Sequence, residues 1–257
     1  MKTHELLFEL SHPIRYEIMQ LLVDRPMRLT KIGEKVDANN PEVSRHLDRL
    51  KNADLVDKNS DGSYYTTSFG EIIMPIIPSL SFVAAHPDYF LEHDLSMLPP
   101  EFIRRLGELE SCEILEGTTI NLHGMEQKGS SSKVRIYTIS NEFVTAITEE
   151  HFAGFDQMVL NGFIFRWILP ESQLEDKNLM ALADHFGTSQ NEYFRVIPKV
   201  PLFCSIIDEE IMISFLDKKG KADFSVGFNS ADPVPLRWGK NLFDNLWDCG
   251  TYLSEFR

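Results

Sequence analysis

The side chains with the clearest chemical potential stand within residues 44–51. They are short donors and cations at helical spacing, namely Ser44, Arg45, His46, Arg49 and Lys51. A helix that enters the major groove of DNA presents such groups, because they bond base edges and phosphate oxygens. The simpler alternative is the solvated face of a surface helix. The surrounding elements must decide between the two.

Two short helices joined by a tight turn are predicted to position this face. The first is expected over residues 30–36 and the second over residues 41–53. Between them, Asp37-Ala38-Asn39-Asn40 is typical of a turn, since Asp and Asn side chains satisfy local backbone groups. Asn40 is expected to cap the second helix, with Pro41 in its first position. Its predicted apolar stripe is Val43, Leu47, Leu50 and Ala53 or Leu55.

A β-hairpin is predicted directly after the second helix. Its strands are expected within residues 56–67, at 56–58 and 63–67, around an Asp61-Gly62 turn. Lys58 and the hairpin tip would contact phosphates, which position a protein without specifying sequence. Of Tyr64 and Tyr65, one should pack on the helices and the other should face DNA or solvent; Tyr64 is included among the candidate DNA contacts. With a helix over 12–23, capped by Ser11, the order of elements predicts a winged helix-turn-helix.

A family resemblance supports this interpretation. Pro41-Glu42-Val43-Ser44-Arg45-His46-Leu47, followed by Leu50 and by Ala53-Asp54-Leu55-Val56, resembles the recognition helix of ArsR-like winged-helix regulators. Asp54 stands where that family usually has glycine. The cysteine motif of metal-sensing members is absent, because the first of the three cysteines (Cys112, Cys204 and Cys249) lies far beyond this segment.

The resemblance extends over most of the chain. Thr67-Ser68-Phe69-Gly70, and Tyr89 to Leu95 before Leu98-Pro99, are similar to archaeal, chiefly methanogen, transcription regulators with an ArsR-like head and a larger effector domain. The resemblance implies a cytoplasmic, dimeric, DNA-binding regulator. It implies no identified ligand.

Charge and composition limit the possible functions. The chain has 257 residues and a net charge of -14, yet residues 1–68 hold 10 Lys+Arg against 11 Asp+Glu. Binding to nucleic acid must therefore come from a few placed side chains and not from the whole surface. No run of 18 apolar residues and no signal-peptide pattern occurs, so we expect no membrane span and a cytoplasmic protein. The spacing of the cysteines predicts neither a disulfide framework nor a metal clip.

Three parts are expected along the chain: a winged helix-turn-helix domain (1–70), a helical connector (71–96) and an α/β effector domain (97–257). The connector should kink near Pro75 and Pro78. It is apolar on all sides, and such a helix must be buried. We expect it to be buried against the same helix of a second copy, in a homodimer.

Residues 97–257 alternate strand and helix patterns, which predicts a mixed, mostly parallel sheet with helices on its faces. The order of elements is weakly similar to a non-catalytic phospholipase-D-like sheet. Strands are expected at 112–116, 134–139, 163–169, 193–197, 202–207, 211–216 and 224–228, helices at 100–109, 143–162, 174–186 and 234–256, and a flexible junction at 129–132.

Signals for catalysis are missing, so no enzyme, metal or cofactor is predicted. The sequence contains no GxGxxG, GxxxxGK[ST], GxSxG or HExxH, and no histidine is followed two residues later by lysine. His86 and His93 are seven residues apart and could share a helical side, which is a weak metal signal. Speculative ligand-binding residues are Asn141 and Glu142, beyond the end of one strand, and Arg166 and Trp167 within another. An internal ion pair is the simpler explanation for Arg166.

Two functional hypotheses follow. The favoured one is a transcription regulator whose recognition helix (41–53) enters the major groove and whose wing (56–67) lies on the backbone. An effector domain that binds a small molecule or partner would shift the population of inter-domain arrangements, moving two recognition helices relative to half-sites about 34 Å apart. The alternative is an enzyme or interaction module that uses the winged helix for docking. The candidate DNA contacts are Thr30, Lys31, Ser44, Arg45, His46, Arg49, Lys51, Lys58 and Tyr64.

Overall fold

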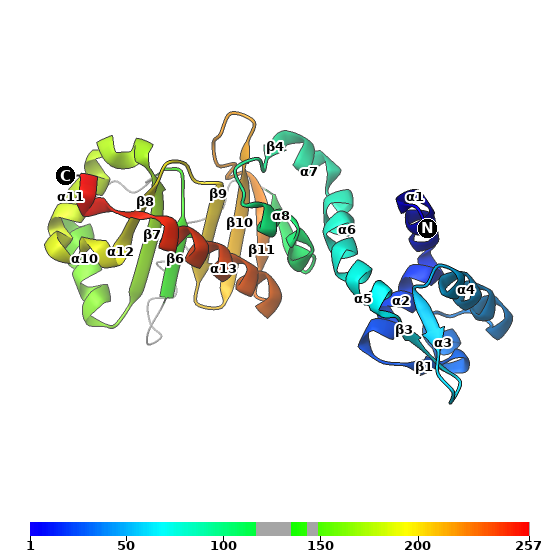
Figure 1. Cartoon of the computed structure of the whole chain (residues 1–257). Coiled ribbons are helices and arrows are strands. Elements are labelled where there is room, and N and C mark those ends of the chain that lie inside the picture. Colours follow the sequence, from blue (N-terminus) through cyan, green and yellow to red (C-terminus); the bar gives the residue numbers. More distant parts are fainter. Residues whose placement is uncertain (117–134, 143–148, 257) are drawn as a thin grey trace. The chain divides into compact units, whose positions relative to one another are not determined.

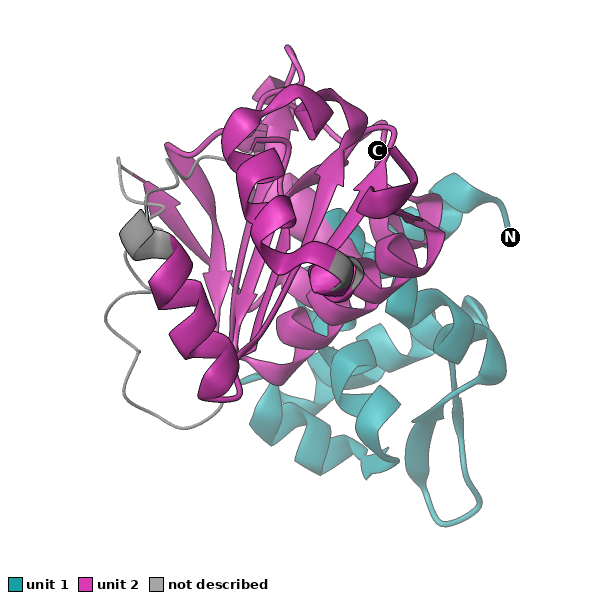
Figure 2. Cartoon of the chain, turned by 90° about the vertical axis from the view of Figure 1, so that its left-hand side faces the viewer, with its two compact units in different colours: residues 1–80 teal, residues 81–257 magenta. Residues whose placement is uncertain are grey.

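The computed structural model describes residues 1–116, 135–142 and 149–256 (Figure 1). The chain forms two compact units, Met1–Leu80 and Ser81–Arg257, which Figure 2 shows in teal and magenta. This division falls inside the segment predicted as a separate connector (71–96). The first part of that segment packs with the N-terminal unit, and the second part packs with the C-terminal unit.

The N-terminal unit is a winged helix-turn-helix, as predicted. Its strands form one antiparallel sheet in the order β1-β3-β2, so the wing is a hairpin with a third short strand added at its edge. Its elements are α1 (Thr3–Leu10), α2 (Pro13–Asp24), β1 (Met27–Arg28), α3 (Leu29–Lys35), α4 (Asn40–Asn52), β2 (Val56–Lys58) and β3 (Ser63–Thr66).

Local side-chain chemistry sets the ends of these helices. The cap of α4 is Asn39, whose side chain accepts a hydrogen bond from the amide of Glu42, so the prediction of an Asn40 cap is wrong by one residue. The prediction that Ser11 caps α2 is also wrong, because His12 is the residue before its first turn and the Ser11 hydroxyl donates to the Phe8 carbonyl. After α4, Asp54 has a φ of 57°. This left-handed conformation explains why glycine is usual at this position, and Asp adopts it more easily than most residues.

The apolar stripe of α4 is buried as predicted. Val43, Leu47 and Leu50 are fully inaccessible, and Ala53 and Leu55 continue the same core. Because these positions anchor the inner side of α4, the intervening polar positions must lie on its outer side.

The connector begins after Thr67, whose hydroxyl accepts a hydrogen bond from the amide of Gly70. A 3₁₀ turn at Pro75 interrupts the helix, which fits the kink expected there. Segment Ser68–Ala85 is long and apolar enough to cross a membrane by length and composition, and 17% of it is buried. The elements of this region are α5 (Ser68–Ile73), η1 (Met74–Ile76), α6 (Ile77–Ala85) and α7 (Pro87–Glu92).

The C-terminal unit contains a nine-stranded mixed sheet. The order is β12-β8-β7-β6-β9-β10-β11-β5, and β4 pairs with β10 off this path. Among the described strands only β6/β7 and β7/β8 are parallel, so the prediction of a mostly parallel sheet is wrong. The strands are β4 (His93–Asp94), β5 (Glu113–Glu116), β6 (Arg135–Ile139), β7 (Ile164–Pro170), β8 (Phe194–Ile197), β9 (Leu202–Ile207), β10 (Glu210–Asp217), β11 (Val226–Ser230) and β12 (Thr251–Tyr252).

Helices cover both faces of this sheet, and each face has its own core. Adjacent residues of β7 show this, because Trp167 belongs to one core and Ile168 to the other. The long helix α13 crosses the Ile168 face, and α10 and α11 pack on the Trp167 face (Figure 1). The helical elements are α8 (Pro100–Ile103), η2 (Leu106–Leu109), α10 (Glu149–Leu160), η3 (Glu171–Glu175), α11 (Lys177–Phe186), η4 (Gly187–Ser189), α12 (Gln190–Tyr193), α13 (Pro233–Cys249) and η5 (Leu253–Phe256).

Two predicted helices differ from the structure. The helix expected over 234–256 ends at Cys249, before strand β12, and the helix expected over 100–109 is divided into α8 and η2. The strands expected at 202–207 and 211–216 are present as β9 and β10, and they pair as an antiparallel hairpin. The predicted junction at 129–132 lies outside the described residues.

Candidate nucleic-acid interface

The outer face of α4 brings together the candidate DNA contacts predicted on that helix. Arg45, Arg49 and Lys51 are exposed, and Ser44 and His46 are half-buried. Arg45 forms no ion pair and no side-chain hydrogen bond with the residues that the structure describes. Its guanidinium therefore keeps all five N–H donors for an external acceptor.

Arg49 is held within the N-terminal unit. Its Nη2 lies 2.6 Å from Oε1 of Glu9, and its Nε lies 2.9 Å from Oε2, so the guanidinium meets the carboxylate with both donors. Its Cζ also lies 5.4 Å from the centre of the Phe8 ring. Arg49 thus ties α4 to α1, and this non-local role differs from the base or phosphate contact predicted for it.

Glu9 also serves a buried arginine. Arg15 is only 4% exposed, and its Nε donates to the Glu9 carbonyl and lies 3.2 Å from the Glu9 carboxylate. The hydrogen bond from Arg49 lowers the pKa of Glu9 below its ordinary value of 4.5, against an opposing effect of burial. One ionised carboxylate therefore holds Arg49 of α4 and the buried Arg15 of α2.

This arrangement predicts a pH dependence of stability. Because folding lowers the pKa of Glu9, its stabilisation is fully present above about pH 4.5 and is lost as the pH falls through the lower folded-state value. The Glu9→Gln variant should be less stable at pH 7 by about 1 kcal/mol, after allowance for the exposure of Arg49. It should also lose less stability than the wild type on acidification below pH 4.5. Urea unfolding at pH 7 and pH 3 measures both effects.

The matched control is Glu17→Gln, which removes an exposed carboxylate from α2. An equal loss of stability on acidification in the Glu9→Gln variant and the wild type would contradict the role given to Glu9.

The His46 side chain packs inside the N-terminal unit, against His12. Its ring centre lies 4.4 Å from that of His12, and the Nδ1 atoms of both rings are buried without a hydrogen-bond partner among the described residues. Burial lowers the pKa of His46, and His12 and Arg15 lower it further. His46 is thus neutral at neutral pH, and it cannot supply a positive charge to a phosphate.

The two wing tyrosines lie on opposite faces of β3, because side chains alternate along a strand. Tyr64 is 6% exposed and belongs to the core, whereas Tyr65 is half-buried. The candidate Tyr64 is therefore wrong as a DNA contact, and Tyr65 is the tyrosine left for DNA or solvent. Lys58 is exposed on the wing, with its Nζ 5.0 Å from the centre of the Tyr64 ring.

The remaining candidates on this unit are exposed, and two of them are paired. Lys51 forms an ion pair with Asp57 of the wing at 2.7 Å. Lys31 forms one with Glu34 within α3 at 2.6 Å, and Thr30 is exposed beside it. Such exposed pairs contribute little stability, so they can exchange for phosphate contacts at low cost.

The four speculative ligand residues of the C-terminal unit do not form one site. Trp167 is buried on one face of the sheet, while Arg166 lies on the opposite face with its Cζ 5.0 Å from the centre of the Trp247 ring. Asn141 donates to the carbonyl of Gly220, and Glu142 is exposed. The described residues instead form an open cavity of about 560 Å³ beside α7, lined in part by His86 and His93. The spacing of these two histidines is visible in the sequence, whereas the strands opposite them are not.

Comparison with known proteins agrees with the geometry of the N-terminal unit. Residues 12–58 match the family model described as bacterial regulatory protein, arsR family. This match confirms the resemblance of the winged helix to ArsR-like regulators.

Similarity to an archaeal regulator extends beyond this domain. The chain is 27% identical over 253 residues to the methanogenesis regulatory protein FilR1 of Methanothrix harundinacea (strain 6Ac), a match that covers 91% of this chain and 54% of that protein. The chain thus spans about half the length of this curated relative.

Two solved structures also align along most of the chain. TrmBL2, an archaeal chromatin protein, is 12% identical with a TM-score of 0.41 and covers 98% of this chain and 100% of its own. HmgR of Pseudomonas aeruginosa is 9% identical with a TM-score of 0.25 and covers 95% of this chain and 98% of its own. At these TM-scores the two likenesses support no further conclusion.

Proposed function

We propose that this chain is a DNA-binding transcription regulator of ArsR-like winged-helix type. The observation that carries the proposal is the agreement between the arsR family match over residues 12–58 and the outer face of α4, where Arg45 is exposed and unpaired among the described residues. In this function α4 enters the major groove. Arg45 and Ser44 contact base edges, and Lys58 of the wing contacts the backbone.

Contacts inside the N-terminal unit reduce the number of side chains on α4 that can contact bases. Since Arg49 is held by Glu9 and His46 leans on His12, fewer side chains remain for base contacts than the polar face suggests. Specificity then depends on a few groups, of which Arg45 is the most important. Thr30, Lys31, Lys51 and Lys58 add phosphate contacts.

The regulator acts as a homodimer in this proposal. Four exposed apolar side chains of the N-terminal unit lie at intervals of three or four residues, so they share one side of the connector helix. Their exposed fractions are 40% to 67%, and a contiguous exposed apolar patch is typical of an interaction surface. This connector stripe consists of Phe69, Ile72, Ile76 and Leu80. Its burial against the same stripe of a second copy places two recognition helices on one DNA duplex.

The C-terminal unit controls the dimer. A small molecule or partner that binds one arrangement of the units better than another shifts the population toward it, and thereby changes the spacing of the two recognition helices. Because the partner is genomic DNA, we place the protein in the cytoplasm. Support for a regulatory role comes from the similarity to the methanogenesis regulatory protein, which extends over 91% of this chain.

Binding to DNA from the protein's own upstream region tests the proposal. Fluorescence anisotropy of the full chain at fixed salt, with an unrelated duplex of equal length as competitor, should give specific binding tighter by about 10³-fold or more. Equal affinity for both duplexes would overturn it.

A further inference from the structure

The cavity beside α7 is lined by several acidic side chains and by no lysine or arginine among the described residues. It lies within the C-terminal unit, between residues 85–93 on one side and strand β5 and residues 223–226 on the other. Its acidic and histidine lining residues are His86, Asp88, Glu92, His93, Glu116 and Asp223. A cavity of about 560 Å³ is of the size that holds a small molecule.

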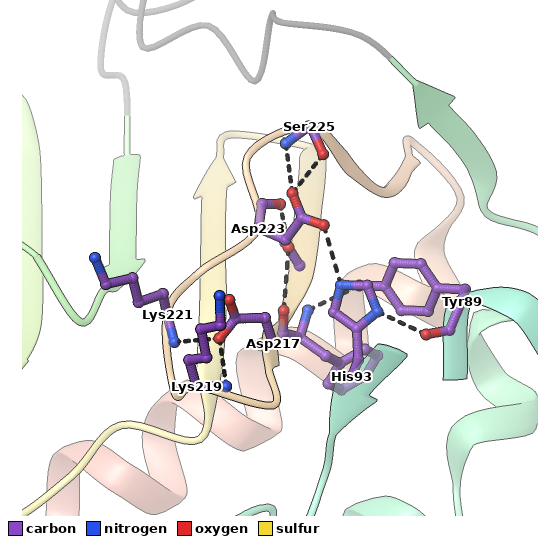
Figure 3. Close-up of polar contacts among 9 residues, drawn as sticks. Tyr89, His93, Asp217, Lys219, Lys221, Asp223 and Ser225 are labelled. Carbon is purple, nitrogen blue, oxygen red and sulfur yellow. Dashed lines mark hydrogen bonds and ion pairs between the residues drawn. The ribbon is translucent and has the colours of Figure 1, made fainter. Parts of the chain in front are cut away.

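His93 is fixed at the base of this cavity. Its side chain is 3% exposed, its ring stacks on Tyr89 with centres 3.8 Å apart, and its Nδ1 lies 2.6 Å from the Tyr89 carbonyl oxygen (Figure 3). A carbonyl oxygen only accepts hydrogen bonds, so Nδ1 must carry the proton that is donated to it. In the neutral ring Nε2 then carries a lone pair and can only accept.

The atom opposite Nε2 is also an acceptor. Oδ2 of Asp223 lies 3.4 Å away, a contact that is an ion pair only if the imidazole is protonated, and Nε2 has no hydrogen-bond partner among the described residues. Oδ1 of Asp223 already accepts from the amide and the hydroxyl of Ser225, at 2.9 Å and 2.5 Å (Figure 3). Burial alone would raise the pKa of Asp223, but the two hydrogen bonds from Ser225 hold it below its ordinary value. The carboxylate is therefore ionised at neutral pH.

The buried Nε2 of His93 and the partly exposed carboxylate of Asp223 are two acceptors that face each other, so they need a donor between them. An unmade hydrogen bond is costly at Nε2 of His93, because that atom is buried. We propose that the cavity binds a small organic cation whose N–H groups donate to Nε2 of His93 and Oδ2 of Asp223. Exposed Asp88, Glu92 and Glu116 attract the cation to the cavity mouth.

The small number of ligand atoms favours an organic cation over a metal ion. Nε2 and Oδ2 supply only two ligands, and no group of three or more His, Cys, Asp or Glu side chains in the described part of the chain is arranged to hold a metal. An ammonium or guanidinium group needs no such coordination shell, since its N–H donors match separate acceptors. Binding of the cation goes beyond the proposed DNA function and can be measured without it.

Isothermal titration of the full chain with agmatine, which carries an ammonium and a guanidinium, tests the site. Asp223→Asn is the informative variant, because its amide oxygen still accepts from Ser225 while its Nδ2 can donate to Nε2 of His93. We expect this variant to fold with an unchanged or raised Tm and to bind agmatine at least about tenfold more weakly. The matched control is Glu171→Gln, which makes the same charge change at an exposed position of η3 and should bind within twofold of the wild type.

Three results would overturn the proposal. One is the absence of saturable binding of both agmatine and spermidine at millimolar concentration. Another is equal weakening by Asp223→Asn and Glu171→Gln, which would mean that the net charge alone attracts the cation. The third is a His93 ring that carries protons on both nitrogens at pH 7.5 by ¹⁵N NMR of the unliganded chain, since an imidazolium would supply the missing donor itself. Titration without DNA, and DNA binding without agmatine, keep this result separate from the proposed function.

Discussion

The Arg45→Ala variant is expected to bind its specific DNA about 5- to 150-fold more weakly than the wild type. This range corresponds to the 1–3 kcal/mol of a bidentate arginine–base contact. Arg45 is exposed on the outer face of α4, and no described residue competes for its guanidinium. Its loss should leave the stability of the N-terminal unit unchanged, because surface substitutions without partners have small effects. Anisotropy at fixed salt and thermal unfolding measure the two properties.

Arg49→Ala should behave differently, although it removes the same charge from the same face. Arg49 donates twice to Glu9, so its replacement should lower the stability of the N-terminal unit more than Arg45→Ala does and weaken specific binding less. Arg25→Ala, at an exposed position just after α2, controls for net charge. If Arg25→Ala and Arg45→Ala weakened binding equally, α4 would not be the recognition helix, and an unchanged affinity in Arg45→Ala would reject the DNA interface itself.

Replacing Ile76 and Leu80 together by glutamate should convert the proposed dimer to a monomer. Both side chains are more than half exposed and belong to the connector stripe. Burying a glutamate at each position in a symmetric interface would bring four unpaired carboxylates together, and each buried unpaired charge costs several kcal/mol. We expect the dissociation constant of the dimer to rise by about three orders of magnitude or more. DNA that carries two half-sites should then be bound with the lower affinity of a single site.

Light scattering coupled to size exclusion measures this change at micromolar concentration. Val23→Glu places a charge on an exposed apolar residue of α2 outside the stripe, and this variant should remain dimeric. A wild-type monomer under these conditions would reject the dimer, and a dimeric Ile76→Glu/Leu80→Glu variant would place the interface elsewhere.

The sequence by itself determined the winged helix-turn-helix, because its signals are local. The apolar spacing of Val43, Leu47 and Leu50 specifies which side of α4 is buried, and the Asp61-Gly62 turn specifies the hairpin. Even the left-handed residue at Asp54 follows from the neighbouring helix end. Errors of one residue at the caps arose because Asn39 and Asn40 carry the same capping group and only the backbone path selects one of them.

Tertiary structure alone decided which polar groups are available, because their partners are distant in the chain. Arg49 meets Glu9 forty residues earlier, and His93 of β4 faces Asp223, which lies in the loop between β10 and β11. The direction of neighbouring strands also depends on distant parts of the chain. Alternating strand and helix patterns do not indicate which strands become neighbours, and β9 pairs with β6 in an antiparallel sense. The polar face of Ser44, Arg45, His46, Arg49 and Lys51 was thus visible as a helix face in the sequence. In the folded unit Arg49 binds Glu9 and His46 packs against His12. Arg45 is then the principal unpaired cation of this face among the described residues.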